Sequence, residues 1–142
     1  MKIKAYGISL YKVTKSGVKI LLCKSVSSKN RWGFLKGVQD KGESEFQTAI
    51  REFKEESSIS VEKKYLEKYF EQKNSQKDIG IYLVNYNNLK GIEKYFIDEK
   101  LQKKYLSWEN SNAQFFDITK LPNIKRKQNK LIQDIIKYLQ KG

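Results

Sequence analysis

The chain has 142 residues, a length that suits one compact domain with a sizeable core, and we expect a single domain over residues 1–142. Hydrophobic residues make up 39% of it, which argues against disorder, and no apolar run reaches the roughly 18 residues of a membrane-spanning helix. The formal net charge of +13 attracts polyanions such as nucleotides, nucleic acid or inositol phosphates. Abundant lysine throughout the chain also suits a role in solubility alone.

The sequence has no histidine and a single cysteine, Cys23, which lies in an apolar run. A single cysteine forms no disulfide within the chain, and no set of residues resembles a zinc site. Lys2, Lys4, Lys12 and Lys15 interrupt the N-terminal segment, so it does not read as a signal peptide. We therefore expect a soluble protein located in the cytoplasm.

Two strands are predicted at the start of the chain, over residues 2–13 and 18–26, where Ile, Val, Leu and Tyr recur. The turn Thr14–Gly17 joins them into a hairpin. A short aromatic segment, 32–34, follows, and we expect a loop with two glycines from Leu35 to Glu43.

A helix is predicted from Ser44 to about Ser57, with Ser44 as its N-cap. Apolar residues recur at intervals of three and four in this segment, which is the spacing of one helix face. These residues are Phe46, Ala49, Ile50 and Phe53.

Strand-like stretches follow at residues 65–72, 78–86 and 113–118. After Pro122 a second amphipathic helix is predicted. Its apolar side comprises Ile124, Leu131, Ile132, Ile135, Ile136 and Leu139, and its other side carries Lys125, Arg126, Lys127 and Lys130. Strands on both sides of a first helix, with a second helix at the end, favour a layered α/β domain with a mixed sheet.

Three acids, Glu52, Glu55 and Glu56, stand at positions i, i+3 and i+4 of the first predicted helix, so they share one side of it. Like charges at this spacing repel, and a divalent cation would compensate them. Carboxylate oxygens suit Mg²⁺ or Mn²⁺, which are often bound together with substrate phosphates. A glutamate-rich helix face is also compatible with a plain solvated surface.

The spacing of residues over a longer stretch, from Gly37 to Ile59, decides between these two interpretations. Gly37 is followed after five residues by Glu43, and after seven more by Arg51-Glu52-Phe53-Lys54-Glu55-Glu56, with Ile59 three residues beyond. This pattern resembles the Nudix box, with Ser58 where the box normally has glycine. The resemblance implies an α/β/α sandwich with a mixed sheet, and a metal-dependent pyrophosphohydrolase that cuts a diphosphate linkage.

Carried over position by position, the resemblance implies a metal site made by acids of the helix and one backbone carbonyl. The implied ligands are Glu52 and Glu56, with Glu55 assisting and the carbonyl of Lys36 completing the site. Arg51 would pair with Glu43 and fix the loop against the helix, and Gly37 would have a structural role. Mg²⁺ is the expected cofactor, with Mn²⁺ as an alternative.

Two flanking segments resemble asymmetric diadenosine tetraphosphate hydrolases. Residues 32–37 read Trp-Gly-Phe-Leu-Lys-Gly, with Leu35 in place of a proline, and residues 106–116 are similar to a segment whose glutamate serves the metal site. This similarity implies that Glu109 is a fourth acid, either a ligand or the base that activates water. A glutamate on a surface loop without such a role is the alternative.

The substrate implied by this resemblance is a nucleoside polyphosphate, above all a dinucleoside polyphosphate such as diadenosine tetraphosphate. Lys36 and Arg31 would hold its outer oxygens, and Tyr82 would offer an aromatic face to a base, although a strand tyrosine also suits core packing. RNA 5′ ends and diphosphoinositol polyphosphates are alternative substrates that suit the basic charge. A catalytically dead module that senses nucleotides is a further alternative, against which the intact acids argue.

Overall fold

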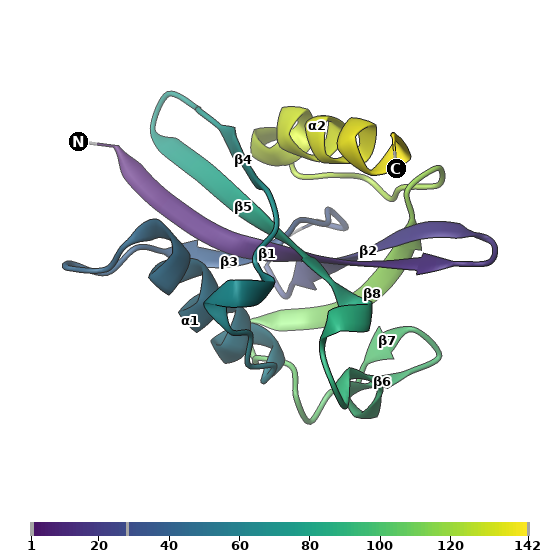
Figure 1. Ribbon diagram of the computed structural model, residues 1–142. Helices are drawn as coiled ribbons and strands as arrows, with labels where there is room; N and C mark the ends of the chain where they lie inside the picture. Colours follow the sequence, from purple (N-terminus) through teal and green to yellow (C-terminus); the bar gives the residue numbers. More distant parts are fainter. Residues whose placement is uncertain (1, 28, 142) are drawn as a thin grey trace.

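The computed structural model describes residues 2–27 and 29–141, and it places a mixed β-sheet between two helices (Figure 1). Within these residues the strands are β1 (Ile3–Thr14), β2 (Gly17–Ser25), β3 (Leu35–Val38), β4 (Tyr69–Gln72), β5 (Lys77–Asn85), β6 (Phe96–Ile97), β7 (Lys100–Leu101) and β8 (Asn110–Asp117), and the helices are α1 (Glu45–Ser57) and α2 (Asn129–Gln140). The sheet order is β4-β5-β1-β2-β8-β7-β6, and β3 pairs with β1. The predicted α/β/α sandwich is confirmed.

β1 organises the sheet because both of its edges are paired. One edge runs parallel to β5 from Ile3 to Tyr11. The other edge is shared, since residues 5–8 pair antiparallel with β3 and residues 11–14 pair antiparallel with β2. The predicted hairpin of β1 and β2 is confirmed, and the split edge sets β3 beside the first half of β1 only.

Each helix covers its own face of the sheet and has its own core. α1 contributes Ala49 and Phe53 to one core, together with strand residues such as Ile8 and Leu21. α2 contributes buried leucines and isoleucines to the other core, which also contains Ile81. In the part of the chain that the structure describes, neither helix has the length and apolarity needed to cross a bilayer.

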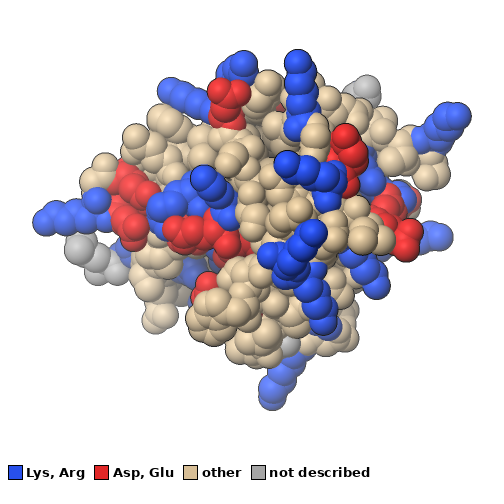
Figure 2. All heavy atoms as spheres, turned by 90° about the horizontal axis from the view of Figure 1, so that it is seen from below, with Lys and Arg blue, Asp and Glu red and all other residues tan. Residues whose placement is uncertain are grey.

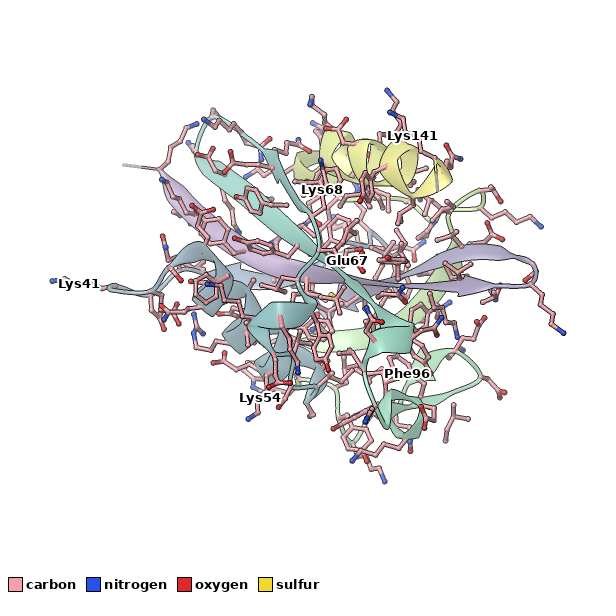
Figure 3. The ribbon with its side chains drawn as sticks, in the orientation of Figure 1. Lys41, Lys54, Glu67, Lys68, Phe96 and Lys141 are labelled. Carbon is pink, nitrogen blue, oxygen red and sulfur yellow. The ribbon has the colours of Figure 1, made fainter. Side chains whose placement is uncertain are left out.

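Figure 3 shows the side chains on this fold. Lys54 of α1 and Lys141, which follows α2, lie at opposite outer sides of the molecule, and both are exposed. Glu67, labelled near the middle of the same view, accepts a hydrogen bond of 2.6 Å from the hydroxyl of Tyr11 on β1. The polar exteriors of both helices are consistent with their amphipathic patterns.

The predicted loop over residues 35–43 is wrong at its start, because Leu35–Val38 forms β3. Leu35 is fully buried in the core beneath α1 and pairs with Ile8 of β1. A four-residue strand offers too short a pattern to recognise without knowledge of its partner. Leucine at position 35 suits this strand, since a proline there would have no N–H to donate to a neighbouring strand.

Two other predicted boundaries also differ from the structure. The strand expected over 65–72 is shorter, because residues 63–65 form a 3₁₀ turn and β4 begins at Tyr69. The helix expected to include Ile124 begins only at Asn129. The segment before α2 is hydrogen-bonded to the backbone of Trp32. The N–H of Trp32 donates to the carbonyl of Asn123 (2.8 Å), and its carbonyl accepts from the N–H of Lys125 (2.9 Å).

Helix α1 begins as its sequence predicts. The hydroxyl of Ser44 accepts from the N–H of Gln47 at 3.3 Å, and the side-chain oxygen of Gln47 accepts from the N–H of Ser44 at 2.9 Å, which together form a capping box. The buried stripe is narrower than expected, since Ala49 and Phe53 are fully buried whereas Phe46 and Ile50 are only partly so.

Ser58 ends α1 in the left-handed conformation, with φ of 68°. This is the backbone position at which glycine is usual, because a side chain there costs energy. The serine is partly compensated, since its hydroxyl donates a 2.7 Å hydrogen bond to the carbonyl of Tyr105.

We expect Ser58→Ala to lower the free energy of unfolding by about 1 kcal/mol, because it keeps the left-handed strain and loses the hydrogen bond. Ser58→Gly should stay within about 1 kcal/mol of the wild type, because relief of strain offsets the lost bond. Urea denaturation of the three proteins measures this. Equal stability of Ser58→Ala and the wild type would contradict the interpretation.

Candidate active site

Arg51 on α1 forms a bidentate ion pair with Glu43, the residue that precedes the helix cap. Its Nε donates to Oε2 of Glu43 at 2.6 Å, and its Nη2 donates to Oε1 at 3.0 Å. The hydroxyl of Thr48 and the backbone N–H of Asp40 also donate to Glu43, each at 2.9 Å. The guanidinium, as the largest cause, lowers the pKa of Glu43 to about 2. The predicted Arg51–Glu43 pair is present.

The same guanidinium also positions acids of the helix itself. Nη1 of Arg51 donates to Glu52 at 2.9 Å and to Glu55 at 3.1 Å, and Nη2 donates to the carbonyl of Val38 at 3.1 Å. Arg51 therefore ties β3, the loop and α1 together. Figure 2 shows acidic and basic side chains interleaved on the side of the molecule where α1 lies.

The carboxylate of Glu52 is pressed against Gly37 of β3. A Cβ atom at Gly37 would lie 2.0 Å from the Cδ and from Oε1 of Glu52. Burial raises the pKa of Glu52, and the negative charges of Glu55 and Glu109 add to this effect, whereas Arg51 opposes it. The resemblance implies a structural role for Gly37, and the contact shows that a side chain there would displace the carboxylate of Glu52.

Glu56, one turn further along α1, is the most strongly perturbed acid of this group. Burial raises its pKa to about 7, and the charge of Glu52 is the next largest cause. Lys36 and the side-chain amide of Asn110, which lies 3.5 Å from Oε1 of Glu56, oppose the rise. A negative charge on these two partly buried acids therefore lacks full compensation from the protein.

The turn before β8 brings the fourth acid to this group. The N–H of Ser107 donates to the backbone carbonyl of Glu56 at 3.0 Å, and the N–H of Asn110 donates to the carbonyl of Ser107 at 3.0 Å. Glu109 lies on this turn, and its charge raises the pKa of both Glu52 and Glu56. The structure thus places Glu109 near the helix acids. Asn110 was missed, because only the folded chain brings it to Glu56.

Lys36 of β3 lies between these acids and a group of basic residues. Burial lowers its pKa to about 8, and the positive charges of Lys77 and Lys125 lower it further, whereas the charge of Glu56 raises it. Arg31 lines the same hollow as Lys36 on that basic side. The two side chains predicted to hold phosphate oxygens therefore lie together.

Tyr82, predicted to face a base, lies elsewhere on the sheet. Its ring centroid is 4.8 Å from that of Tyr69, and it packs partly buried against the core beneath α1. Burial raises the pKa of Tyr82, and the acid that adds to this rise is Glu45, in the first turn of the helix, rather than Glu52 or Glu56. A role in binding substrate stays a prediction for this residue.

The described residues contain no group of three His, Cys, Asp or Glu side chains placed to hold a metal ion. Glu52 and Glu56 nevertheless fit a hard divalent cation. Both offer carboxylate oxygens, and burial raises the pKa of both, with the charges of neighbouring acids adding to the effect. A cation on this pair would draw its other ligands from backbone, water or substrate oxygens, which is usual for Mg²⁺.

The sequence matches the family model of the NUDIX domain over residues 4–135, and the chain therefore belongs to the Nudix family. A curated relative from Caenorhabditis elegans, a bis(5′-nucleosyl)-tetraphosphatase (asymmetrical), is 32% identical over 94 residues, which cover 62% of this chain and 68% of the relative. These two similarities identify the chain as a Nudix pyrophosphohydrolase. Nudix hydrolases generally act on nucleoside polyphosphates and use divalent metal ions.

Solved structures support the fold. A binary complex of a C. elegans Ap4A hydrolase superimposes with a TM-score of 0.69 at 22% identity and covers 99% of both chains. A NUDIX hydrolase from Nitrosomonas europaea gives a TM-score of 0.70 at 16% identity, over 99% of this chain and 73% of that one. At these identities the likeness concerns the arrangement of helices and strands alone.

We expect Gly37→Ala to fold normally but to lower turnover of a nucleoside polyphosphate by about 10- to 100-fold. The new methyl group would meet the mobile end of Glu52, which can move aside, so the fold is kept while the carboxylate is displaced. Steady-state kinetics and thermal unfolding measure the two effects. Val38→Ala, at an exposed neighbour, is the control, and unchanged turnover in Gly37→Ala would contradict the assignment.

Because the pKa of Glu43 is lower in the folded protein than its ordinary value of 4.5, its pairing stabilises the fold above pH 4.5 and is lost as pH falls towards about 2. We therefore expect Glu43→Gln to be less stable than the wild type at pH 7, with a difference that shrinks below pH 4.5. Urea denaturation at several pH values measures this. A difference that is constant with pH would be inconsistent with the pairing, and Glu62→Gln controls for the loss of one acid.

Proposed function

We propose that this protein uses Mg²⁺, or alternatively Mn²⁺, to hydrolyse a diphosphate linkage in a nucleoside polyphosphate, with diadenosine tetraphosphate as the leading substrate. One observation carries the proposal. Glu52 and Glu56 are partly buried acids of one helix whose pKa values are raised by burial; Lys36 lies near Glu56, and Arg51 donates a hydrogen bond to Glu52. The name of the C. elegans relative supports the choice of substrate.

In this proposal Glu52 and Glu56 are the main metal ligands, Glu55 assists them, and the backbone carbonyl of Lys36 completes the set. When bound, a divalent cation neutralises phosphate charge and makes the phosphorus easier to attack. Arg51 holds Glu52 and Glu55 by hydrogen bonds of 2.9 and 3.1 Å, so it acts as a positioning residue.

The chain's own groups then complete the reaction. A water oxygen forms a bond to one phosphorus, the bond from that phosphorus to the bridging oxygen breaks, and the water proton passes to Glu109, whose turn is hydrogen-bonded to Glu56. The side chains of Lys36 and Arg31 hold the outer phosphate oxygens. No covalent intermediate is needed, because positioning and charge stabilisation supply most of the catalysis in phosphoryl transfer.

An RNA 5′ end is the second candidate substrate. It is favoured by Lys125, Arg126 and Lys127, which precede α2 and line the same hollow as Lys36. Phosphates along an RNA strand would extend from the acids across these residues. Tyr82 stays a candidate contact for a base under either substrate.

The proposal is tested by turnover with Mg²⁺ or Mn²⁺ on diadenosine tetraphosphate, 5′-triphosphorylated RNA, capped RNA and diphosphoinositol phosphates. We expect Glu56→Gln to lose about 100-fold or more, because several kcal/mol of charge stabilisation depend on the metal. Glu62→Gln, an exposed acid of the same type, is the matched control. Absence of metal-dependent turnover on every substrate would refute the proposal.

A further inference from the structure

Trp108 is the most exposed aromatic side chain among the described residues, with 84% of its surface accessible. It belongs to neither core of the sandwich. No ring or cation–π contact within the described chain involves it. The other tryptophan, Trp32, is 7% exposed and packs edge-on against Phe116 with ring centroids 4.7 Å apart. Trp108 therefore contributes little to the stability of the fold.

The position of Trp108 is what indicates a role, since single exposed apolar side chains are common on protein surfaces. Trp108 stands immediately before Glu109, the acid proposed to take the water proton. On its other side, the N–H of Ser107 donates to the backbone carbonyl of Glu56 at 3.0 Å. The indole is thus carried by the same turn that brings Glu109 to the acids of α1.

Hydrogen bonds on both sides of Trp108 fix this turn. The carbonyl of Glu109 accepts from the N–H of Val26, which follows β2, at 3.0 Å. Earlier in the chain, the carbonyl of Tyr105 accepts a 2.7 Å hydrogen bond from the hydroxyl of Ser58 at the end of α1. A tryptophan has only two side-chain torsions, so on a fixed backbone it loses little conformational entropy when it binds a ligand.

A hollow of about 230 Å³ lies beside the indole, and we call it the tryptophan hollow. Its lining residues are Lys103, Leu106, Ser107, Trp108, Asn110 and Ser111. They offer one aromatic face, one cation and three side chains that both donate and accept hydrogen bonds. A nucleobase presents a flat π face and an edge of donors and acceptors, and its sugar presents hydroxyl groups. The lining therefore suits a nucleoside.

The tryptophan hollow meets the acids from a different part of the chain than Lys36 does. The side-chain amide of Asn110, one of its lining groups, lies 3.5 Å from Oε1 of Glu56. It shares no lining residue with the hollow at Lys36, which contains no aromatic ring. A substrate whose phosphates extend towards Lys36 thus has a separate surface available for a nucleoside.

We propose that Trp108 stacks against a nucleobase of the substrate and is a specificity-determining residue of this enzyme. The inference rests on the proposed function and deepens it, because it assigns the aromatic contact to the turn before β8. Tyr82, in contrast, already packs against Tyr69, with ring centroids 4.8 Å apart. The base can belong to a free dinucleoside polyphosphate or to the first nucleotide of an RNA 5′ end, and the kinetic experiment distinguishes these two sources.

The first test is quenching of tryptophan fluorescence without metal, so that it does not depend on turnover. The chain has two tryptophans, and Trp108→Phe leaves Trp32 as the only one. ATP should quench the wild type saturably, because a stacked purine covers the exposed indole, whereas inorganic tripolyphosphate, which has no base, should not. The quenching by ATP should be absent from Trp108→Phe. Equal quenching in both proteins, equal quenching by both anions, or no quenching by ATP would overturn the proposal.

Steady-state kinetics form the second test. Trp108→Ala should raise KM for diadenosine tetraphosphate at least about tenfold and change kcat less than about threefold, because stacking holds the base before and during the reaction. Trp108→Phe keeps an aromatic face and should stay within about threefold of the wild type in KM. Tyr138→Ala, which removes an exposed aromatic ring from α2, is the control and should leave KM unchanged. Both Trp108 variants should unfold within about 2 °C of the wild type, since neither core loses a contact.

The same variants are compared on 5′-triphosphorylated RNA. An increase in KM for one substrate only assigns the base contact to that substrate, and an increase for both assigns it to both; each of these results supports the proposal. An equal KM in Trp108→Ala and the wild type on both substrates would overturn it. Quenching that depends on Trp108 without turnover of any substrate would count against the proposed function alone. Turnover with a KM independent of Trp108 would count against this inference alone.

Discussion

The guanidinium of Arg51 joins three parts of the chain: the loop before α1, α1 itself and the end of β3. It holds Glu43 before the helix, Glu52 and Glu55 on α1, and the carbonyl of Val38 at the end of β3. The helix acids repel one another at their spacing, and one arginine beside them reduces that repulsion while it fixes their orientation. Burial raises the pKa of Glu52 and Glu56, Arg51 opposes this rise at Glu52, and a cation supplied from outside the chain would compensate the negative charge that remains.

Local patterns allowed much of this to be predicted. The apolar spacing and the cap at Ser44 predict α1, because they depend on neighbours within one helix. The resemblance to the Nudix box implies the Arg51–Glu43 pair, which the structure has. The resemblance places Ser58 where glycine is usual, and the structure has a left-handed backbone there. The confirmed family membership agrees with these predictions, since the family model spans residues 4–135.

Contacts between distant parts of the chain set what the sequence alone could not provide. β3 was taken for a loop because its partner, β1, lies some thirty residues earlier in the chain. Lys125 was expected on the solvent side of a helix, but Trp32 holds its backbone before α2 begins, which turns residues 125–127 towards Lys36. A cluster of acids and a cluster of bases thus meet at β3. Part of the positive charge of the chain is thus concentrated beside the acids, and this arrangement suits a substrate that carries several phosphates in succession.

The central claim is that Glu52 and Glu56 together hold a divalent cation. The most direct measurement is binding of Mn²⁺ to the chain without substrate, followed by the electron paramagnetic resonance signal of the free ion. The account predicts saturable binding that is lost when Glu52 and Glu56 are both replaced by glutamine and kept when Glu62 and Glu71, two exposed acids, are replaced in the same way. Binding of equal strength in the two double variants would contradict it, and so would the absence of saturable binding to the wild type.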